Sequence, residues 1–336
     1  MANSSYNYSL LTITSFTCIP VGVVGTITNV FLLIIISTSK SLKDPGYKII
    51  SNIIACDGIS SIQFFVIFLG PYLLTDSTFY ASRIYCRILF CSMYSTYNVS
   101  AFSLTAISFH RCKIVIKASQ TRFKKLELQK INRLIAIIWI FSYVFSVPVI
   151  FFTDTSKVVT GYCDISYVQG YSYLTLVYFV CMAAVTYTIP LIAMTINYAR
   201  LIKRLQTHIT PGENQISTLL SRRRDQVTRT LIAVTSIFML FNGPLFITFI
   251  CMAANLKNYY LLRNENFIVY FISLLALPMA LFVSAINPIF YISFDKNILE
   301  VVMQKLGMKS EDNTCIHSVT LRSKSRKVLA RSNSQL

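Results

Sequence analysis

The chain has 336 residues, of which 54% are hydrophobic and only 13% are Asp, Glu, Lys or Arg. Globular proteins carry about 25% charged residues, so this chain has too little charge to cover a soluble fold, and most of its surface must face lipid. With nine Cys and nineteen Gly plus Pro, the composition also excludes a small disulfide scaffold, a collagen and a disordered chain. The net charge of +18 would suit a nucleic-acid-binding protein, so the positions of the charges must decide between the two interpretations.

Charged residues divide the sequence into seven long windows that contain few or no charges. A hydrocarbon core of about 30 Å needs about 20 apolar residues per helix, and each window is long enough to supply them. We therefore predict seven transmembrane helices. The windows are residues 1–39, 49–75, 88–109, 134–153, 165–199, 230–256 and 266–294.

Basic residues lie mainly on one side of the predicted bundle. If the N-terminus is outside, only five of the 31 Lys and Arg residues fall in the outer segments. Cytoplasmic loops are enriched in Lys and Arg, so we predict an extracellular N-terminus and no nucleic-acid partner. No basic residue precedes Lys40, which favours a first span over a cleaved signal peptide. Asn3 and Asn7 begin glycosylation sequons in the predicted outer tail.

The domain organisation follows from the same pattern. With no repeat of fixed period and short loops, the chain is predicted to be an all-α membrane protein, a single seven-transmembrane helix bundle over residues 10–294. An extracellular N-terminal tail, residues 1–9, precedes it. Residues 295–306 carry apolar side chains at Ile298, Leu299, Val301, Val302 and Leu306 among charged ones, as a short amphipathic membrane-surface helix does. Residues 307–336 are polar, basic and Ser-rich, and form the predicted cytoplasmic tail.

Asp57 is the only acidic residue within any predicted span. Two interpretations remain open. In the structural one, the carboxyl group is protonated or hydrogen-bonded to neighbours such as Asn52 and Asn29. In the functional one, it forms a cation or proton site. A lone carboxylate lacks the partner that proton relays normally need, which disfavours a transporter.

An enzyme is also disfavoured. The three histidines fall at the inner edge of the predicted bundle or beyond it, and no His-Glu-x-x-His motif, phosphate loop or Ser-His-Asp arrangement is visible. They are His110, His208 and His317.

Motifs in successive windows match a known family in type, order and spacing. Residues 10–305 resemble the rhodopsin-like (class A) G-protein-coupled receptors, and the stretch from Asp225 to Leu231 is similar to their peptide-receptor branch. The motif residues, in chain order, are Asn29, Asn52-Ile-Ile-Ala-Cys-Asp57, Cys86, His110-Arg111-Cys112, Trp139, Pro148, Pro190, Tyr198, Phe238-Met-Leu-Phe-Asn242-Gly-Pro244 and Asn287-Pro288-Ile-Phe-Tyr291.

The resemblance implies three structural features. A disulfide is expected between Cys86 and Cys163, both in the oxidising compartment. A sodium ion is expected beside Asp57, Ser100, Ser284 and Asn287, because buried oxygen ligands suit a hard cation. Activation and G-protein coupling are expected to use His110, Arg111, Tyr198, Phe238, Pro244, Asn287, Pro288 and Tyr291.

Three departures from the family pattern modify these expectations. His110 stands where the family has an acid beside Arg111, and Arg224 stands where the sixth helix usually carries an acid. The ion pairs that restrain Arg111 are therefore absent, and we expect appreciable basal activity. Asn242 stands where a bulky aromatic residue usually forms the floor of the ligand cavity.

The ligand class is predicted from the residue types that are absent from the predicted helices and from those that are present. Window 266–294 has no Lys, so retinal is not expected. Amine receptors of the family have an Asp where this chain has Met93 and Tyr94, so amines are disfavoured. Acidic residues in the outer loops suit a basic peptide, so a peptide is the predicted ligand, with a lipid, a nucleotide or an odorant as the alternatives. The expected cavity lining is apolar and aromatic: Met93, Tyr94, Tyr97, Tyr178, Met182, Phe246, Phe249 and Leu277.

The remaining predictions concern partners and location. Basic segments 113–133 and 200–229 suit both anionic lipid and a heterotrimeric G protein. Ser and Thr among the basic residues of the tail suit receptor kinases and arrestin, since phosphate would reverse the local charge. The chain is expected to be a multi-pass plasma-membrane protein with no cofactor apart from sodium.

Overall fold

The structure of the protein, a computed structural model, describes residues 2–74, 77–117, 124–155, 161–167, 171, 173–207, 215–256 and 267–308. Its elements follow the predicted windows. They are the helices α1 (Ala2–Thr38), α2 (Pro45–Leu73), α3 (Phe79–Lys117), α4 (Lys124–Ser146), α5 (Tyr173–Ala183), α6 (Ile189–Thr207), α7 (Gln215–Asn255), α9 (Phe267–Phe294) and α10 (Lys296–Lys305), and the strands β1 (Thr153–Thr155) and β2 (Cys163–Ile165).

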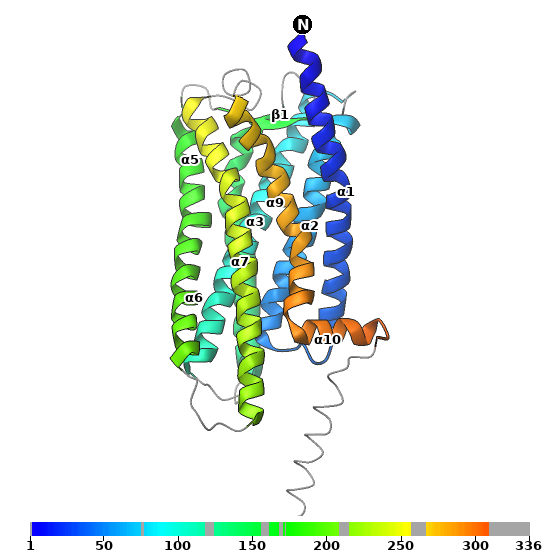
Figure 1. Ribbon diagram of the computed structural model, residues 1–336. Helices are drawn as coiled ribbons and strands as arrows, with labels where there is room; N and C mark the ends of the chain where they lie inside the picture. The colour runs from blue at the N-terminus through cyan, green and yellow to red at the C-terminus, as the bar shows by residue number, and fades with distance from the viewer. Residues whose placement is uncertain are drawn as a thin grey trace, which may run out of the picture.

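The helices form one bundle of seven, which confirms the predicted fold class (Figure 1). A π-helical stretch, Ala184–Thr188, joins α5 to α6, so these two helices together make the fifth member. We call the end of the bundle at which α1 begins the outer end, and the end that carries α10 the inner end. Residues 2–9, expected as a tail, continue helix α1 in this structure. The side chains of Asn3 and Asn7 lie outside the described part of the chain, so their glycosylation stays a prediction.

The helices differ in how apolar they are. Within the described residues, six candidate membrane spans are long and apolar enough to cross a bilayer, and α3 is the member of the bundle that falls short. Its length of 39 residues is ample, so the shortfall is in hydropathy. The polar side chains responsible are buried against neighbouring helices: Ser82, Ser95, Thr96, Asn98, Ser100, Ser103 and Ser108. The helix at the centre of the bundle is therefore the most polar one, because it meets protein where the outer helices meet lipid.

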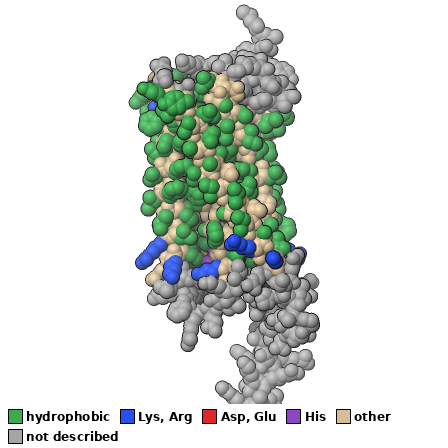
Figure 2. Space-filling view, turned by 90° about the vertical axis from the view of Figure 1, so that its left-hand side faces the viewer, with side chains coloured by type: hydrophobic (Ala, Val, Ile, Leu, Met, Phe, Trp, Pro, Cys, Tyr) green, Lys and Arg blue, Asp and Glu red, His purple; other side chains and the backbone are tan. Residues whose placement is uncertain are grey.

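The surface matches this arrangement. A band of hydrophobic side chains covers the middle of the face drawn in Figure 2, and blue Lys and Arg side chains gather at its inner edge. Such a band is what a bilayer requires of the lipid-facing surface. The exposed basic residues of the inner end are Lys40, Lys43, Lys48, Lys113, Lys130, Arg133, Arg200, Lys203, Arg229, Lys296 and Lys305.

Helix α10 lies across the inner end, at a steep angle to the bundle (Figure 1). It begins where the Asp295 carboxylate accepts hydrogen bonds from the backbone amides of Asn297 and Ile298, an N-cap that satisfies two otherwise unpaired donors. It ends before Gly307, whose φ of +73° suits glycine. Ile298 and Val302 are buried against the bundle, so the predicted amphipathic helix is present.

A short antiparallel hairpin covers part of the outer end. Strand β1 pairs with β2 so that Thr153 faces Ile165 and Thr155 faces Cys163. The hairpin packs against α3.

Candidate functional site

The predicted disulfide is present. Cys86, near the outer end of α3, is bonded to Cys163 in β2 with an S–S distance of 2.04 Å. A second tie runs from α3 to β1, where the Arg83 Nε atom lies 2.9 Å from the Asp154 carboxylate. On the other side, the Tyr167 hydroxyl donates to the carbonyl of Met252 in α7 at 2.8 Å. The hairpin is thus held to α3 and to α7 at the outer end.

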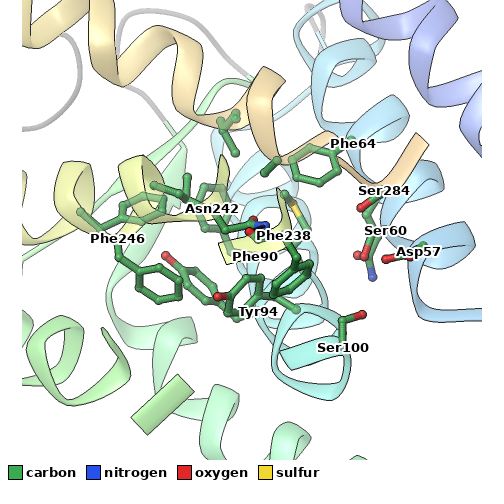
Figure 3. Close-up of a pocket in the computed structure, with 17 residues that line it drawn as sticks. Asp57, Ser60, Phe64, Phe90, Tyr94, Ser100, Phe238, Asn242, Phe246 and Ser284 are labelled. Atoms are coloured by element: carbon green, nitrogen blue, oxygen red, sulfur yellow. Dashed lines mark hydrogen bonds between the residues drawn. The ribbon is translucent and has the colours of Figure 1, made fainter. Parts of the chain in front are cut away.

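A cavity lies between α2, α3, α7 and α9, below this hairpin. Six of the eight predicted ligand-binding residues line it, and they include four of its seven aromatic side chains (Figure 3). The six are Met93, Tyr94, Tyr97, Phe246, Phe249 and Leu277. Aromatic contacts hold this wall together, including Tyr97 with Phe246 at a centroid distance of 5.1 Å.

The other two predicted ligand-binding residues lie outside the cavity lining. Tyr178 stacks on Phe152 at 4.9 Å, and its hydroxyl points to the carbonyl of Phe145. Met182 is fully buried in the hydrophobic core of the outer half of the bundle. Both residues therefore support the wall behind the cavity.

Sequence reasoning missed the contribution of α2 to this cavity. Ser60, Gln63 and Phe64 line it from α2, opposite the aromatic wall. The Gln63 amide donates to the Ser92 hydroxyl at 2.6 Å and accepts from Thr96 at 2.9 Å, which fixes its orientation. The signal that could have indicated this contribution was a second large polar side chain, Gln63, six residues after Asp57 in the same predicted span.

Asp57 lies at the other end of the same cavity and is buried. Its carboxylate accepts a hydrogen bond from the Asn287 amide at 2.8 Å, and the predicted neighbours Asn29 and Asn52 bond elsewhere. Asn29 donates to the carbonyls of Gly25 and Ser284.

The predicted sodium ligands fit a hard cation. Asp57, Ser100 and Ser284 line the same end of the cavity, and Asn287 bonds to Asp57. Two buried oxygens there, Ser100 Oγ and Asn287 Oδ1, have no hydrogen-bond partner among the described residues. One carboxylate with neutral oxygens is the donor set that such an ion prefers.

Arg111 stands at the inner end of α3, beside the start of α2. Gly46 lies beside it, and a β-carbon at Gly46 would be in ordinary van der Waals contact with Arg111 Nη2, at 3.4 Å, and with His110 Cε1, at 3.6 Å. Near it, the Asp295 carboxylate accepts from the Tyr47 hydroxyl at 3.3 Å. Burial raises the pKa of Asp295, and its capping hydrogen bonds and the charge of Arg111 oppose that rise.

The other predicted activation residues lie between Arg111 and the cavity. Tyr198 and Tyr291 are both buried, and the Tyr198 hydroxyl is hydrogen-bonded to Thr235 at 3.0 Å. Phe238 stacks on Tyr97 at 5.3 Å, which joins α7 to α3 at the cavity floor. Pro288 lies inside α9, next to Asn287.

Helix α7 contains Pro244, which removes one helical hydrogen bond and permits a bend. The Tyr187 hydroxyl, from the π-helical stretch, donates to the carbonyl of Met239 just before this point, at 3.1 Å. Gly243 permits that approach, since a β-carbon there would lie 2.8 Å from the hydroxyl. The Asn242 side chain donates back to the carbonyl of Phe238 within α7.

Comparison with known proteins identifies the same family as the sequence motifs do. Residues 28–291 match the family "7 transmembrane receptor (rhodopsin family)". The chain is 30% identical over 199 residues to "Rhodopsin, GQ-coupled" of Mizuhopecten yessoensis, an alignment that covers 56% of this chain and 38% of that protein. It is 29% identical over 231 residues to "Tachykinin-like peptides receptor 99D" of Drosophila melanogaster, covering 64% and 43%.

A longer alignment reaches "Galanin receptor 2a" of Danio rerio, with 23% identity over 285 residues, 82% of this chain and 72% of that protein. The chain therefore spans about two fifths of the first two relatives and most of the third. The matching family consists of receptors and not of enzymes. On the match over residues 28–291, the chain belongs to the rhodopsin family of seven-transmembrane receptors.

Proposed function

We propose that this receptor binds an extracellular peptide and activates a heterotrimeric G protein from the plasma membrane, with its outer end extracellular and its inner end cytosolic. The observation that carries the proposal is the placement of a cavity and of Arg111 in one bundle. The cavity lies towards the outer end, and Arg111 lies at the inner end of α3, which lines the cavity. A ligand that moves α7 against α3 would change the surroundings of Arg111, because both helices meet at Phe238 and Tyr97.

The peptide class is supported by the printed names of the relatives, which include tachykinin-like peptide and galanin receptors. Asp154 and Asp164 of the outer hairpin add nothing to this support, because Asp154 is ion-paired with Arg83 and Asp164 is buried. Retinal is not part of the proposal, although one relative is a rhodopsin, because α9 contains no Lys to hold it. A sodium ion at Asp57 is part of it, on the fit of the oxygens described above.

The exposed basic residues of the inner end support contact with anionic lipid and with the G protein. Arrestin and receptor kinases belong to the proposal through the Ser and Thr residues of segment 309–336, which lies outside the described residues.

The test is G-protein activation in cells that express the intact chain or its Arg111→Ala variant, with a panel of amidated neuropeptides. A peptide response that the substitution abolishes is the expected result. If basal activity depends on Arg111 and no peptide acts, the ligand belongs to the lipid, nucleotide or odorant classes. If no signal depends on Arg111 in any condition, the proposal is wrong and a transport role is favoured.

A further inference from the structure

One acidic side chain is buried at the inner end of the bundle. Asp295 stands between the end of α9 and the start of α10, and its exposed fraction is 1% (Figure 1). The other acids whose side chains the structure describes at this end are Asp44, which is exposed, and Glu300, which is half-buried. The N-cap of α10 explains a polar residue here, but Ser, Thr or Asn would also serve as the cap. The negative charge of Asp295 therefore needs a reason of its own.

The contacts of Asp295 suit an ionised carboxylate. Its oxygens accept hydrogen bonds from the backbone amides of Asn297 and Ile298, at 3.0 and 3.3 Å, and from the Tyr47 hydroxyl at 3.3 Å. The Tyr47 oxygen accepts in turn from the Asn297 side chain at 2.8 Å, which leaves its own proton for Asp295. Since Asp295 accepts in all of these contacts, none of them needs a proton on its carboxyl group.

Asp295 makes no direct ion pair with any residue that the structure describes. Its neighbour Lys296 is exposed, as is every other Lys or Arg described at the inner end except Arg111. Arg111 is half-buried, and its Nε atom is fully buried. A buried carboxylate without a nearby cation is costly, so Arg111 is the positive charge placed to offset this cost.

Arg111 reaches the same cluster from α3. Its Nη2 atom lies against the first turn of α2, 3.4 Å from where a β-carbon of Gly46 would be, and Tyr47 is the next residue of that turn. Arg111 Nε makes no hydrogen bond with any described residue, so the guanidinium is not fixed by that atom. Burial raises the pKa of Asp295, and the charge of Arg111 is among the interactions that oppose the rise, so the two charges lie within electrostatic reach.

The residues that could otherwise restrain Arg111 carry no negative charge. His110 precedes it in α3, and Arg224 stands in α7 where an acid is usual. Asp225 is the one acid beside Arg224, and its side chain lies outside the described part of the chain. The proposed function needs Arg111 to reach a G protein at the inner end. An attraction towards α2 and α10 therefore favours the resting position of its side chain.

We propose that Asp295 is a positioning residue for Arg111: its charge, acting past the Tyr47 hydroxyl, holds the guanidinium against the first turn of α2, and release of this hold is a step of activation. The activation step rests on the proposed function, whereas the coupling of the two charges does not. Because the charges are not in direct contact, the hold is weaker than an ion pair. The appreciable basal activity expected from the sequence is compatible with such a hold.

The first test is a double-mutant cycle of thermal unfolding, with the purified full chain in detergent at neutral pH. Arg111→Gln is expected to lower Tm by about 2 to 4 °C when residue 295 is Asp, and by less than about 1 °C in the Asp295→Asn background. In the first case a buried carboxylate loses its cation, and in the second its charge is already absent. Asp295→Asn keeps a side chain that caps α10, so this helix is retained.

Two matched charge removals are the controls for this cycle. Asp44→Asn and Glu300→Gln each remove an acid of the inner end, and both are expected to leave the full effect of Arg111→Gln on Tm. Arg111→Lys keeps the positive charge and is expected to lower Tm less than Arg111→Gln does. If Asp295→Asn does not fold, this last comparison still decides, because equal losses would mean that packing and not charge is responsible.

The second test is ligand-independent G-protein activation at equal surface expression. Asp295→Asn is expected to raise this signal about fivefold, and Asp295→Glu, which keeps the charge, is expected to stay near the wild-type level. A role limited to capping α10 predicts the opposite order, because Asn is a preferred N-cap residue and Glu is not.

The outcomes separate this proposal from the receptor function. An effect of Arg111→Gln on Tm that does not depend on residue 295 overturns the proposal, as does one that disappears in Asp225→Asn instead. Coupling in Tm with an unchanged basal signal in Asp295→Asn overturns the activation step. If the coupling is present and no signal in any condition depends on Arg111, the charge pair stands and the proposed function is wrong.

Discussion

At the scale of single residues, the hydrogen bond that links Tyr187 to α7 depends on the Tyr187 hydroxyl and on the absence of a β-carbon at Gly243. The hydroxyl donates to the Met239 carbonyl, and Gly243 leaves the space for it. Because the link lies beside Pro244, where α7 can bend, it restrains the motion that the proposed function requires.

Removing this hydroxyl is expected to raise basal signalling. Hydrogen bonds between membrane helices contribute about 0.6 kcal/mol on average, so Tyr187→Phe should shift the resting equilibrium by about threefold. Gly243→Ala should act in the same direction, since its β-carbon displaces the hydroxyl. The measurement is ligand-independent G-protein activation at equal surface expression. Tyr143→Phe, on the exposed face of α4, is the control, and equal signalling from all four proteins would contradict the role of the link.

Asp295 gives a prediction about pH. Its pKa is raised, chiefly by burial, so the folded state favours the protonated carboxyl. The stability it contributes is present below the ordinary aspartate pKa of about 3.9 and is lost as the pH rises through the raised value. Asp295→Asn keeps an N-cap and removes the titration, so its stability relative to the wild type should increase over this pH range. The measurement is the Tm of both proteins in detergent as the pH is raised. A Tm difference between Asp295→Asn and the wild type that does not vary with pH would refute the prediction.

The cavity shows which residues could be predicted from sequence. Tyr94 and Tyr97 were identifiable because α3 carries recognisable motifs at both ends, which fix its register. Gln63 was not, because its place in the cavity depends on the rotation of α2 against α3, and several residues of that window have similar hydropathy. Tyr178 turned out to pack on Phe152, a residue whose position depends on the loop after α4.

At the scale of helices, Asn52 joins three elements. Its amide donates to Ser103 of α3 at 2.9 Å, and its carbonyl accepts from the Trp139 indole of α4 at 2.9 Å. These bonds lie among lipid-spanning helices, where no water replaces a lost partner.

Asn52→Ala should therefore loosen α4 as well as α3. We expect the free energy of unfolding to fall by about 1 to 3 kcal/mol, because the Ser103 hydroxyl and the Trp139 indole both lose a hydrogen-bond partner. Trp139→Phe should cost less, and the double variant should cost less than the sum of the two, since they share one bond. Thermal unfolding of the three variants measures the coupling, and additive effects would contradict it.

The helix boundaries were predictable where charges mark them, as at Lys40 and Lys296. The π-helical stretch Ala184–Thr188 was not predictable, because it depends on how α5 packs against its neighbours and not on a residue pattern. The hairpin of β1 and β2 is likewise set by the disulfide and by α3, since each strand has three residues.

At the scale of the whole molecule, the exposed basic residues of the inner end predict the orientation that the proposed function needs, with that end in the cytosol. Epitope tags at the two ends of the chain should show it: antibody should label the N-terminal tag on intact cells and the C-terminal tag only after permeabilisation. Labelling of both tags on intact cells would overturn the topology. A tag in segment 257–266, between α7 and α9, should label like the N-terminal one.

The polar character of α3 has a consequence for how the protein is made. A helix whose buried face carries Ser, Thr and Asn is a poor substrate for insertion into lipid by itself, because membrane insertion is governed by the apolarity of each segment. Its neighbour α2 precedes it by a few residues and covers part of that polar face. We expect the two helices to leave the translocon as a pair, so a nascent chain that carries α3 without α2 should be left on the wrong side of the membrane and be degraded.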